Sequence, residues 1–236
     1  MKDAPMEGQK ALMLGAGWPQ LALDLAAKGI FVTVVDPDES RIKDISRLAG
    51  EAKLLGRVTV MQDDYRKRTF EPSAFNLVVA WDTLERYSEI EPMVKKVLRE
   101  LKAGGRLFVR ARITPAQTRP ALRRALRSLL PLIAFGERQA LAQDSFLLPT
   151  HGTVPIEDVL GPIDEHLVIQ ETIPHHVVAG DVADLAAGVA PALAALLPAV
   201  RKLDAQLLER WPDAARFIAV SATKEKQLGR VFRPGL

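Results

Sequence analysis

The sequence predicts an α/β fold in which a mostly parallel sheet is covered by helices on both faces. In the first half of the chain, short apolar runs alternate with helical stretches. Each run is continuously apolar, which is typical of parallel strands buried on both faces. The 236 residues are 48% hydrophobic and 26% charged. This composition supplies a core and excludes a disordered chain, a collagen-like repeat and a small disulfide scaffold.

The first half is expected to contain five strands and three helices. The strands are predicted at 11–14, 30–35, 58–62, 75–81 and 106–113. The helices are predicted at 19–28, at about 39–48 and at 90–102. Gly29 is expected to end the first helix, Asp38 to cap the second, and Gly104-Gly105 to end the third.

The second half has a different pattern. Residues 114–153 are rich in Arg, Leu and Pro and contain no strand signal. Two further strands are predicted at 166–173 and 216–223, with a mostly helical segment between them. Because there is no internal repeat or low-complexity linker, we expect one domain with a helical elaboration. Its parts are a core at 11–113, an insertion at about 114–153, and C-terminal strands and helices at 154–224.

Composition also narrows the function and the compartment. Cysteine is absent, which excludes disulfides, thiolate nucleophiles and cysteine metal sites and fits a reducing cytoplasm. Residues 1–10 carry charges of both signs without an apolar stretch, so no signal peptide is expected. The longest uncharged run, 185–200, is shorter than the roughly 20 residues of a membrane span. A net charge of +3 is by itself too small to argue for nucleic-acid binding, although the isoelectric point of about 9.2 keeps that function open.

Candidate site residues lie where the predicted strands end, because open α/β sheets bind ligands at the carboxyl ends of their strands. The first strand is followed by the turn Gly15-Ala16-Gly17-Trp18-Pro19. Asp36 ends the second strand, 21 residues after Gly15, where an acid can accept hydrogen bonds from ribose hydroxyls. The alternatives are a plain tight turn and a helix cap. A dinucleotide G-x-G-x-x-G pattern would need glycine at position 20, where Gln20 stands.

Four segments together resemble the Rossmann-like (class I) S-adenosylmethionine-dependent methyltransferases in order and spacing. They are residues 11–17, 34–40, 75–86 and 97–109. The resemblance covers 11–113, and 216–224 is similar to the closing antiparallel strand of that family. It implies a three-layer sandwich with a mostly parallel seven-stranded sheet, and S-adenosylmethionine (SAM) as the cofactor, with S-adenosylhomocysteine (SAH) as its product.

The same resemblance implies a role for individual residues around the cofactor. The glycine loop would be Gly15, Ala16 and Gly17, and Asp36 beside Pro37 would bind the ribose. Asp64, 11 residues before Phe75, resembles the acid that binds the adenine amine, with Asp63 as the alternative, and Tyr65 would flank the adenine. Trp81 and Asp82 would lie beside the methionine end.

Two positions depart from the family pattern. Met13 stands where the family usually carries an acid near the cationic amino-acid end of the cofactor, and Pro19 replaces the third glycine. Asp82 could supply the missing charge. The departures also leave open a protein that binds SAM without catalysing a reaction.

Few residues are candidates for the chemistry itself. His175, His176 and His151 have the pKa of a general base, although surface histidines are the alternative reading. Adjacent histidines on a strand end point to opposite faces, so no metal site is expected. Arg86 and Tyr87 occupy the position where many relatives carry a histidine. Residues 66–68 are expected to form a solvated basic loop.

The insertion has a distinctive charge pattern. Six arginines fall within 110–127, at positions 110, 112, 119, 123, 124 and 127, and the apolar run 129–135 follows them. The arginines have four interpretations. They could bind an anionic substrate, a phosphate backbone or a membrane surface, or they could form a solvated helix face. With the apolar run, the segment is expected to form a lid over an apolar substrate, an interfacial helix being the alternative.

The expected function is SAM-dependent methyl transfer to a small, partly apolar metabolite by in-line displacement. A SAM-binding regulatory or scaffold protein is the main alternative, followed by an RNA methyltransferase and by transfer of another part of SAM. The expected partner is a small-molecule substrate, with no stable nucleic-acid partner and no transmembrane segment. A homodimer is left open.

Overall fold

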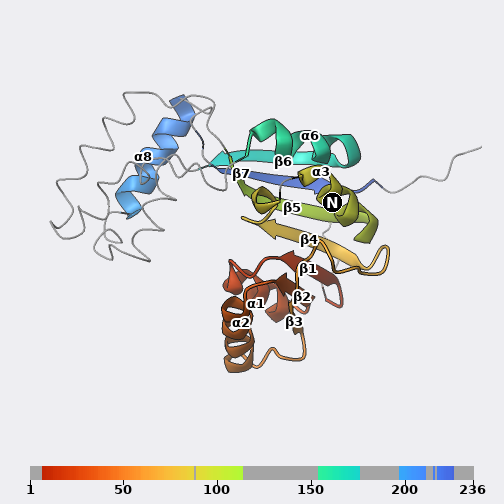
Figure 1. Cartoon of the computed structure of the whole chain (residues 1–236). Helices are drawn as coiled ribbons and strands as arrows, with labels where there is room; N and C mark the ends of the chain where they lie inside the picture. Colours follow the sequence, from red (N-terminus) through yellow and green to blue (C-terminus); the bar gives the residue numbers. More distant parts are fainter. Residues whose placement is uncertain are drawn as a thin grey trace, which may run out of the picture. The chain divides into compact units, whose positions relative to one another are not determined.

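The computed structural model describes residues 7–87, 89–113, 154–175, 197–210, 215 and 217–225. Seven strands form one sheet in the order β3-β2-β1-β4-β5-β7-β6 (Figure 1). The strands are β1 (Lys10–Leu14), β2 (Phe31–Asp36), β3 (Val58–Gln62), β4 (Phe75–Trp81), β5 (Leu101–Arg112), β6 (Val168–His175) and β7 (Phe217–Thr223). The helices are α1 (Pro19–Ala27), α2 (Glu39–Glu51), the 3₁₀ turn η1 (Leu84–Arg86), α3 (Ile90–Glu100), α6 (Ile156–His166) and α8 (Leu197–Arg210).

The sheet reverses its order beside β1. This strand pairs in parallel with β2 on one side and with β4 on the other, so that Leu12 lies opposite both Thr33 and Val78. The loops after β1 and β4 therefore leave the same edge of the sheet next to each other. Such a switch point is where open α/β sheets bind their ligands.

The closing strand runs antiparallel, as predicted. At the end of β7, the amide of Gly104 donates to the carbonyl oxygen of Lys224 at 2.8 Å, and the amide of Lys224 donates to that of Gly105 at 2.9 Å. The end of β7 therefore lies beside the start of β5, so the two strands run in opposite directions. The predicted mostly parallel seven-stranded sheet with one antiparallel strand is confirmed.

The core forms where β1 is buried on both faces. Residues 11–14 have no exposed surface, and α1 and α2 pack their apolar residues against β1, β2 and β3. Members of this cluster include Leu23, Leu25, Ile45, Val32 and Val34. Burial of each large side chain stabilises the fold by about 1.5–3 kcal/mol. The loops at the strand ends are therefore carried on a rigid support.

Local signals in the first half are confirmed with small changes of boundary. Gly29 has a φ of +89° and follows α1, and the Asp38 carboxylate caps α2 by accepting from the amides of Ser40 and Arg41. In the second half, the strand predicted at 166–173 lies at Val168–His175 because His166 ends α6.

The pair Gly104-Gly105 was expected to end a helix, and this expectation is wrong. Helix α3 already ends at Glu100, and β5 begins at the next residue. Leu101 pairs with Phe75 and Arg106 with Leu77, so β5 advances five residues while β4 advances two. The extra residues form a bulge in which Gly104 takes a φ of +75°. The two glycines therefore allow the bulge that bends β5.

The chain divides into two compact units. One comprises Met1–Ala111, Glu157–Thr172 and Val220–Leu236, and the other comprises Arg112–Ile156 and Ile173–Ala219. The expectation of a single functional domain stays a prediction. Among the described residues, none of the helices has the length and apolar character needed to traverse a bilayer.

Candidate functional site

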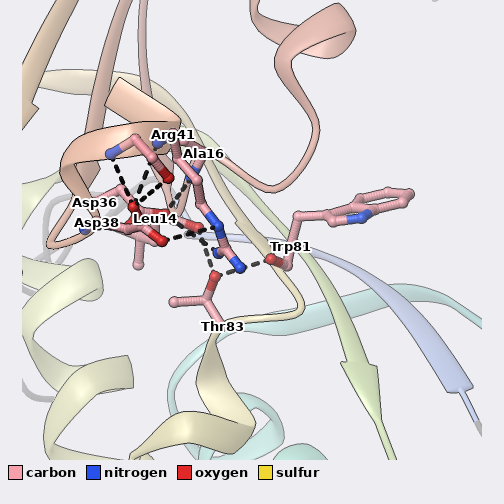
Figure 2. Close-up of polar contacts among 8 residues, drawn as sticks. Leu14, Ala16, Asp36, Asp38, Arg41, Trp81 and Thr83 are labelled. Carbon is pink, nitrogen blue, oxygen red and sulfur yellow. Dashed lines mark hydrogen bonds and ion pairs between the residues drawn. The ribbon is translucent and has the colours of Figure 1, made fainter. Parts of the chain in front are cut away.

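The turn after β1 requires glycine at its first position. Gly15 has a φ of +88°, and its amide donates to the carbonyl oxygen of Val35 at 2.8 Å. A Cβ at this position would lie 2.5 Å from the hydroxyl oxygen of Thr83. That hydroxyl is itself held within 2.7 Å of the carbonyl oxygen of Leu14 and 2.8 Å of that of Trp81 (Figure 2). The turn after β1 and the turn after β4 are thus in direct contact.

Asp36 ties the glycine turn to the end of β2. Its side chain is 1% exposed, and one carboxylate oxygen accepts from the amide of Ala16 at 2.7 Å (Figure 2). The other oxygen accepts from the amide of Asp38 at 2.8 Å. An Arg41 guanidinium nitrogen lies 3.7 Å from the oxygen that accepts from Ala16. Asp38 supplies the cap of α2, so Asp36 is not required as a helix cap.

Asp64 follows β3 and is held by a neighbouring cation. The Arg66 side chain donates from Nε to both carboxylate oxygens of Asp64, at 3.0 and 2.9 Å. These hydrogen bonds hold the pKa of the Asp64 carboxyl below its usual value. The Arg66 guanidinium also lies 5.7 Å from the ring centre of Tyr87. Although Arg66 is exposed, it is part of the site and not only of a solvated loop.

Tyr65 is more deeply buried than a residue that merely flanks a base. It is 2% exposed, and its hydroxyl donates to the Glu100 carboxylate at 2.7 Å. Glu100 is fully buried and also accepts from the amide of Phe70 at 3.3 Å. The Lys96 ammonium group lies 4.3 Å from the centre of the Tyr65 ring. These contacts fasten the loop after β3 to helix α3.

A cavity of about 180 Å³ lies at the switch point. Its walls combine residues from the ends of β1, β2, β3 and β4: Gly15, Val35, Asp36, Pro37, Asp64, Tyr65, Arg66, Thr83, Arg86 and Tyr87. Five of the predicted cofactor residues are among them, namely Gly15, Asp36, Pro37, Asp64 and Tyr65. The predicted residues Ala16, Gly17, Asp63, Trp81 and Asp82 lie beside the cavity and do not line it.

Sequence reasoning missed five of the lining residues. Val35, Thr83 and Arg66 were given no role in binding, and Arg86 and Tyr87 were considered only as replacements for a histidine. A polar residue two positions after a strand end, such as Thr83, was the available signal. No pattern could show that its hydroxyl would face the glycine turn, because the two are 68 residues apart.

Three aromatic side chains, from the turn after β1, the end of β4 and the middle of β5, lie together without lining the cavity. The ring centres of Trp18 and Trp81 are 4.2 Å apart, and those of Trp81 and Phe108 are 6.2 Å apart. We call these three residues the aromatic cluster. The Arg110 guanidinium lies 4.9 Å from the Trp81 ring centre and forms an ion pair with Asp82. The aromatic cluster therefore lies next to an ion pair of opposite charges.

The predicted catalytic histidines stay predictions. His175 is the last residue of β6, and His151 and His176 lie outside the described residues. Of the arginine-rich stretch, Arg110 and Arg112 belong to β5. The other four arginines and the apolar run 129–135 also lie outside the described residues.

A family model matches the part of the chain that builds the site. Residues 11–105 match the family model described as a methyltransferase domain. The match covers less than half of the chain, and over this segment it confirms the resemblance to class I SAM-dependent methyltransferases. The segment includes every residue that lines the cavity.

Curated relatives match part of the chain at modest identity. The ubiquinone biosynthesis O-methyltransferase of Xylella fastidiosa (strain 9a5c) is 32% identical over 114 residues, which are 46% of this chain and 44% of that protein. The corresponding protein of Rhizobium leguminosarum bv. trifolii (strain WSM2304) is 28% identical over 110 residues, 44% of this chain and 41% of that protein. The match thus spans less than half the length of these relatives.

Solved structures share the fold over most of the chain. The [4+2]-cyclase SpnF matches with a TM-score of 0.59 and 20% identity, covering 93% of this chain and 75% of that one. Geranyl diphosphate C-methyltransferase from Streptomyces coelicolor A3(2) matches with a TM-score of 0.57 and 12% identity, covering 92% and 69%. At these identities the likeness establishes the fold.

The buried phenols beside the cavity give a testable pH dependence. The chain has two tyrosines, and burial raises the pKa of both Tyr65 and Tyr87 above the ordinary value. A raised phenol pKa stabilises the fold below about pH 10, and this contribution is lost as the pH rises beyond that point. We expect phenolate absorbance to appear at higher pH in the folded protein than in the denatured chain.

The control for this titration is the denatured chain, in which both phenols should ionise at about pH 10. Tyr87→Phe leaves Tyr65 alone, and its phenolate signal should then coincide with loss of the folded circular dichroism spectrum. Phenolate formation at about pH 10 in folded Tyr87→Phe protein would show that Tyr65 is not buried as described.

Proposed function

We propose that the protein is a SAM-dependent methyltransferase that acts on a small, partly apolar metabolite by in-line displacement. The observation that carries the proposal is the cavity at the switch point. Its lining includes the carboxylates of Asp36 and Asp64 and Gly15 of the glycine turn. A nucleoside offers complementary groups, since its ribose hydroxyls and adenine amine are hydrogen-bond donors. The family match over 11–105 supports the same assignment.

The residues present fit the nucleoside part of SAM. Each Asp36 oxygen accepts one backbone amide, at 2.7 and 2.8 Å, and a carboxylate oxygen has two lone-pair sites. Asp36 can therefore hold the loop and accept ribose hydroxyls at the same time. Asp64 lies one strand further, and neighbouring strands are about 4.8 Å apart. The absence of a side chain at Gly15 lets the backbone approach the ligand.

The chemistry rests on position more than on a strong base. Bound SAM supplies a methyl group on a positively charged sulfur, which an acceptor atom attacks from the opposite side. Correct orientation of such reactants can lower a barrier by about 7–11 kcal/mol. A general base contributes roughly 10²- to 10⁴-fold. The aromatic cluster would hold an apolar acceptor and exclude water, and His175, His176 and His151 stay the proposed bases.

A partly apolar acceptor agrees with several observations. Trp18 is 37% exposed beside Trp81, so part of the aromatic cluster is open to solvent. The names of two similar proteins, a ubiquinone biosynthesis O-methyltransferase and a geranyl diphosphate C-methyltransferase, refer to molecules with apolar parts. We therefore propose a phenol or a prenylated compound as the acceptor class.

Binding without methyl transfer is the second candidate function. Met13 has no exposed surface and occupies the position where the resemblance leads one to expect an acid. In addition, one protein of this fold is named as a [4+2]-cyclase. Both observations favour a test that separates cofactor binding from turnover.

RNA methylation is less well supported. Arg110 pairs with Asp82, and Arg112 lies 5.3 Å from the ring centre of Phe217, so two arginines of the basic stretch already have partners.

We propose a cytoplasmic, single-domain protein with a small-molecule substrate. Strongly salt-dependent RNA binding would argue for the alternative.

Calorimetric titration tests the proposal at Asp64. We expect SAH to bind at one site per chain and SAM to compete with it. Asp64→Asn should weaken SAH binding about ten-fold, because a hydrogen bond to a charged group contributes about 1.5–3 kcal/mol. Asp63→Asn tests the alternative acid: Asp63 does not line the cavity, and the asparagine oxygen can still accept from the Asp64 amide, so the affinity should stay unchanged if Asp64 is the binding acid.

The outcomes separate the candidate functions. Methyl transfer from SAM to a member of a panel of phenols and prenylated compounds would support the first proposal. SAH binding without turnover across that panel would favour the non-catalytic alternative. If wild-type protein binds neither SAM nor SAH, both proposals are wrong.

A further inference from the structure

The side chain of Arg66 fills the acceptor positions of the Asp64 carboxylate. Its Nε donates to both oxygens, at 3.0 and 2.9 Å, and its Nη2 donates to Oδ2 at 2.5 Å. The main-chain amide of Arg66 adds a hydrogen bond to Oδ1 at 3.0 Å. A carboxylate has about four acceptor positions, and these donors already make four contacts with it. Asp64 therefore accepts a hydrogen bond from a ligand only if the Arg66 side chain withdraws.

Arg66 and Asp64 both line the cavity at the switch point, so their ion pair lies where a ligand would bind. The proposed function assigns Asp64 to the adenine amine of the cofactor. That amine is a hydrogen-bond donor, as the guanidinium is, and it needs the same carboxylate oxygens. The two donors therefore compete for one acid.

The loop that carries Arg66 is held by its main chain and not by this ion pair. The Lys96 ammonium group donates to the carbonyl oxygens of Tyr65, Arg66 and Arg68. The amide of Arg68 also donates to the carbonyl oxygen of Asp64, at 3.1 Å. The Arg66 side chain is 60% exposed. It can therefore turn into solvent while the loop and the Asp64 carboxylate keep their places.

We propose that the Arg66 side chain is an internal competitor of the cofactor, which holds Asp64 before binding and releases it when the adenine amine arrives. The inference rests on the proposed binding of SAM. Ion pairs between exposed groups are weak in water, so the contact lowers the affinity for the cofactor without preventing binding. Arg66 thus sets how tightly the site holds its ligand.

A second acid–arginine pair in the same loop provides the comparison. Arg68 Nη1 lies 3.5 Å from Asp63 Oδ2, and neither residue lines the cavity. Arg66 and Arg68 are both exposed, and each carries one positive charge. Replacement of either arginine changes the charge of the loop equally, but only the replacement of Arg66 frees an acid in the cavity.

Calorimetric titration with SAH tests the proposal on two methionine variants, because methionine keeps much of the length of arginine and has no donor. Arg66→Met should bind SAH about two- to five-fold more tightly than the wild-type protein, since exposed ion pairs are of that strength. Arg68→Met should keep the wild-type affinity. A misfolded variant would not produce a gain in affinity, so the expected result reports on the site itself.

The gain should also depend on the acid. In an Asp64→Asn background, Arg66→Met should no longer tighten SAH binding, because the carboxylate for which the two donors compete is gone. The inference is overturned if Arg66→Met leaves SAH binding unchanged or weakens it. It is also overturned if Arg68→Met gives the same gain, or if the gain persists undiminished with Asp64→Asn. In each of these cases SAH still binds to the wild-type protein and the proposed function stands, whereas absence of SAH binding to the wild-type protein would contradict that function itself.

Discussion

Asp36→Ala is expected to weaken SAH binding by about 100-fold or more and to lower the thermal stability of the protein. The variant removes the acceptor for the ribose hydroxyls, each worth about 1.5–3 kcal/mol to a charged partner. It also leaves the Ala16 amide, now bound at 2.7 Å, without its acceptor. An unsatisfied buried amide costs about 1–3 kcal/mol. Calorimetry and thermal melting measure the two effects separately.

Asp38→Ala is the matched control for this prediction. Asp38 is an acid two residues away that caps α2 by accepting from the amides of Ser40 and Arg41. Loss of the cap should cost about 0.5–2 kcal/mol of stability and leave the affinity for SAH unchanged. If Asp36→Ala and Asp38→Ala weaken binding to the same extent, Asp36 acts only through stability and the proposed ribose contact is wrong.

Gly15→Ala is expected to abolish SAH binding. The new Cβ would lie 2.5 Å from the hydroxyl oxygen of Thr83, at a residue whose φ is +88°. The left-handed backbone alone costs about 1–2 kcal/mol for a residue with a side chain. Relief of the clash must move Thr83 away from the carbonyl oxygens of Leu14 and Trp81, which changes the wall of the cavity.

Gly17→Ala provides the comparison within the same turn. A Cβ at Gly17 meets no atom within 4 Å, so this variant should keep the melting temperature of the wild-type protein. Its effect on SAH binding reports how closely the ligand approaches the second glycine. A Gly15→Ala protein with wild-type stability and affinity would show that the turn does not have the described geometry.

Much of the first half could be predicted from the sequence because its signals are local. Continuous apolar runs indicated β1 to β4 nearly to the residue, and the Asp38 cap depends on atoms within three residues of it. Asp36 was identified from its spacing to Gly15. The prediction that Gly104 and Gly105 end a helix is wrong because a helix end and a strand bulge both use a left-handed glycine. Only the pairing of β5 with β4 distinguishes the two.

Local patterns in the sequence were enough to predict the α/β class, the order of the main elements, and an acid at the end of β2 beside a glycine turn. Which side chains meet became known only from the folded chain. Thr83 faces Gly15, Arg66 hydrogen-bonds Asp64, Tyr65 hydrogen-bonds Glu100, and Arg110 pairs with Asp82. The difference lies in distance along the chain, because a strand or a cap depends on near neighbours. The pairing of Asp82 with a residue 28 positions away depends on the register between β4 and β5.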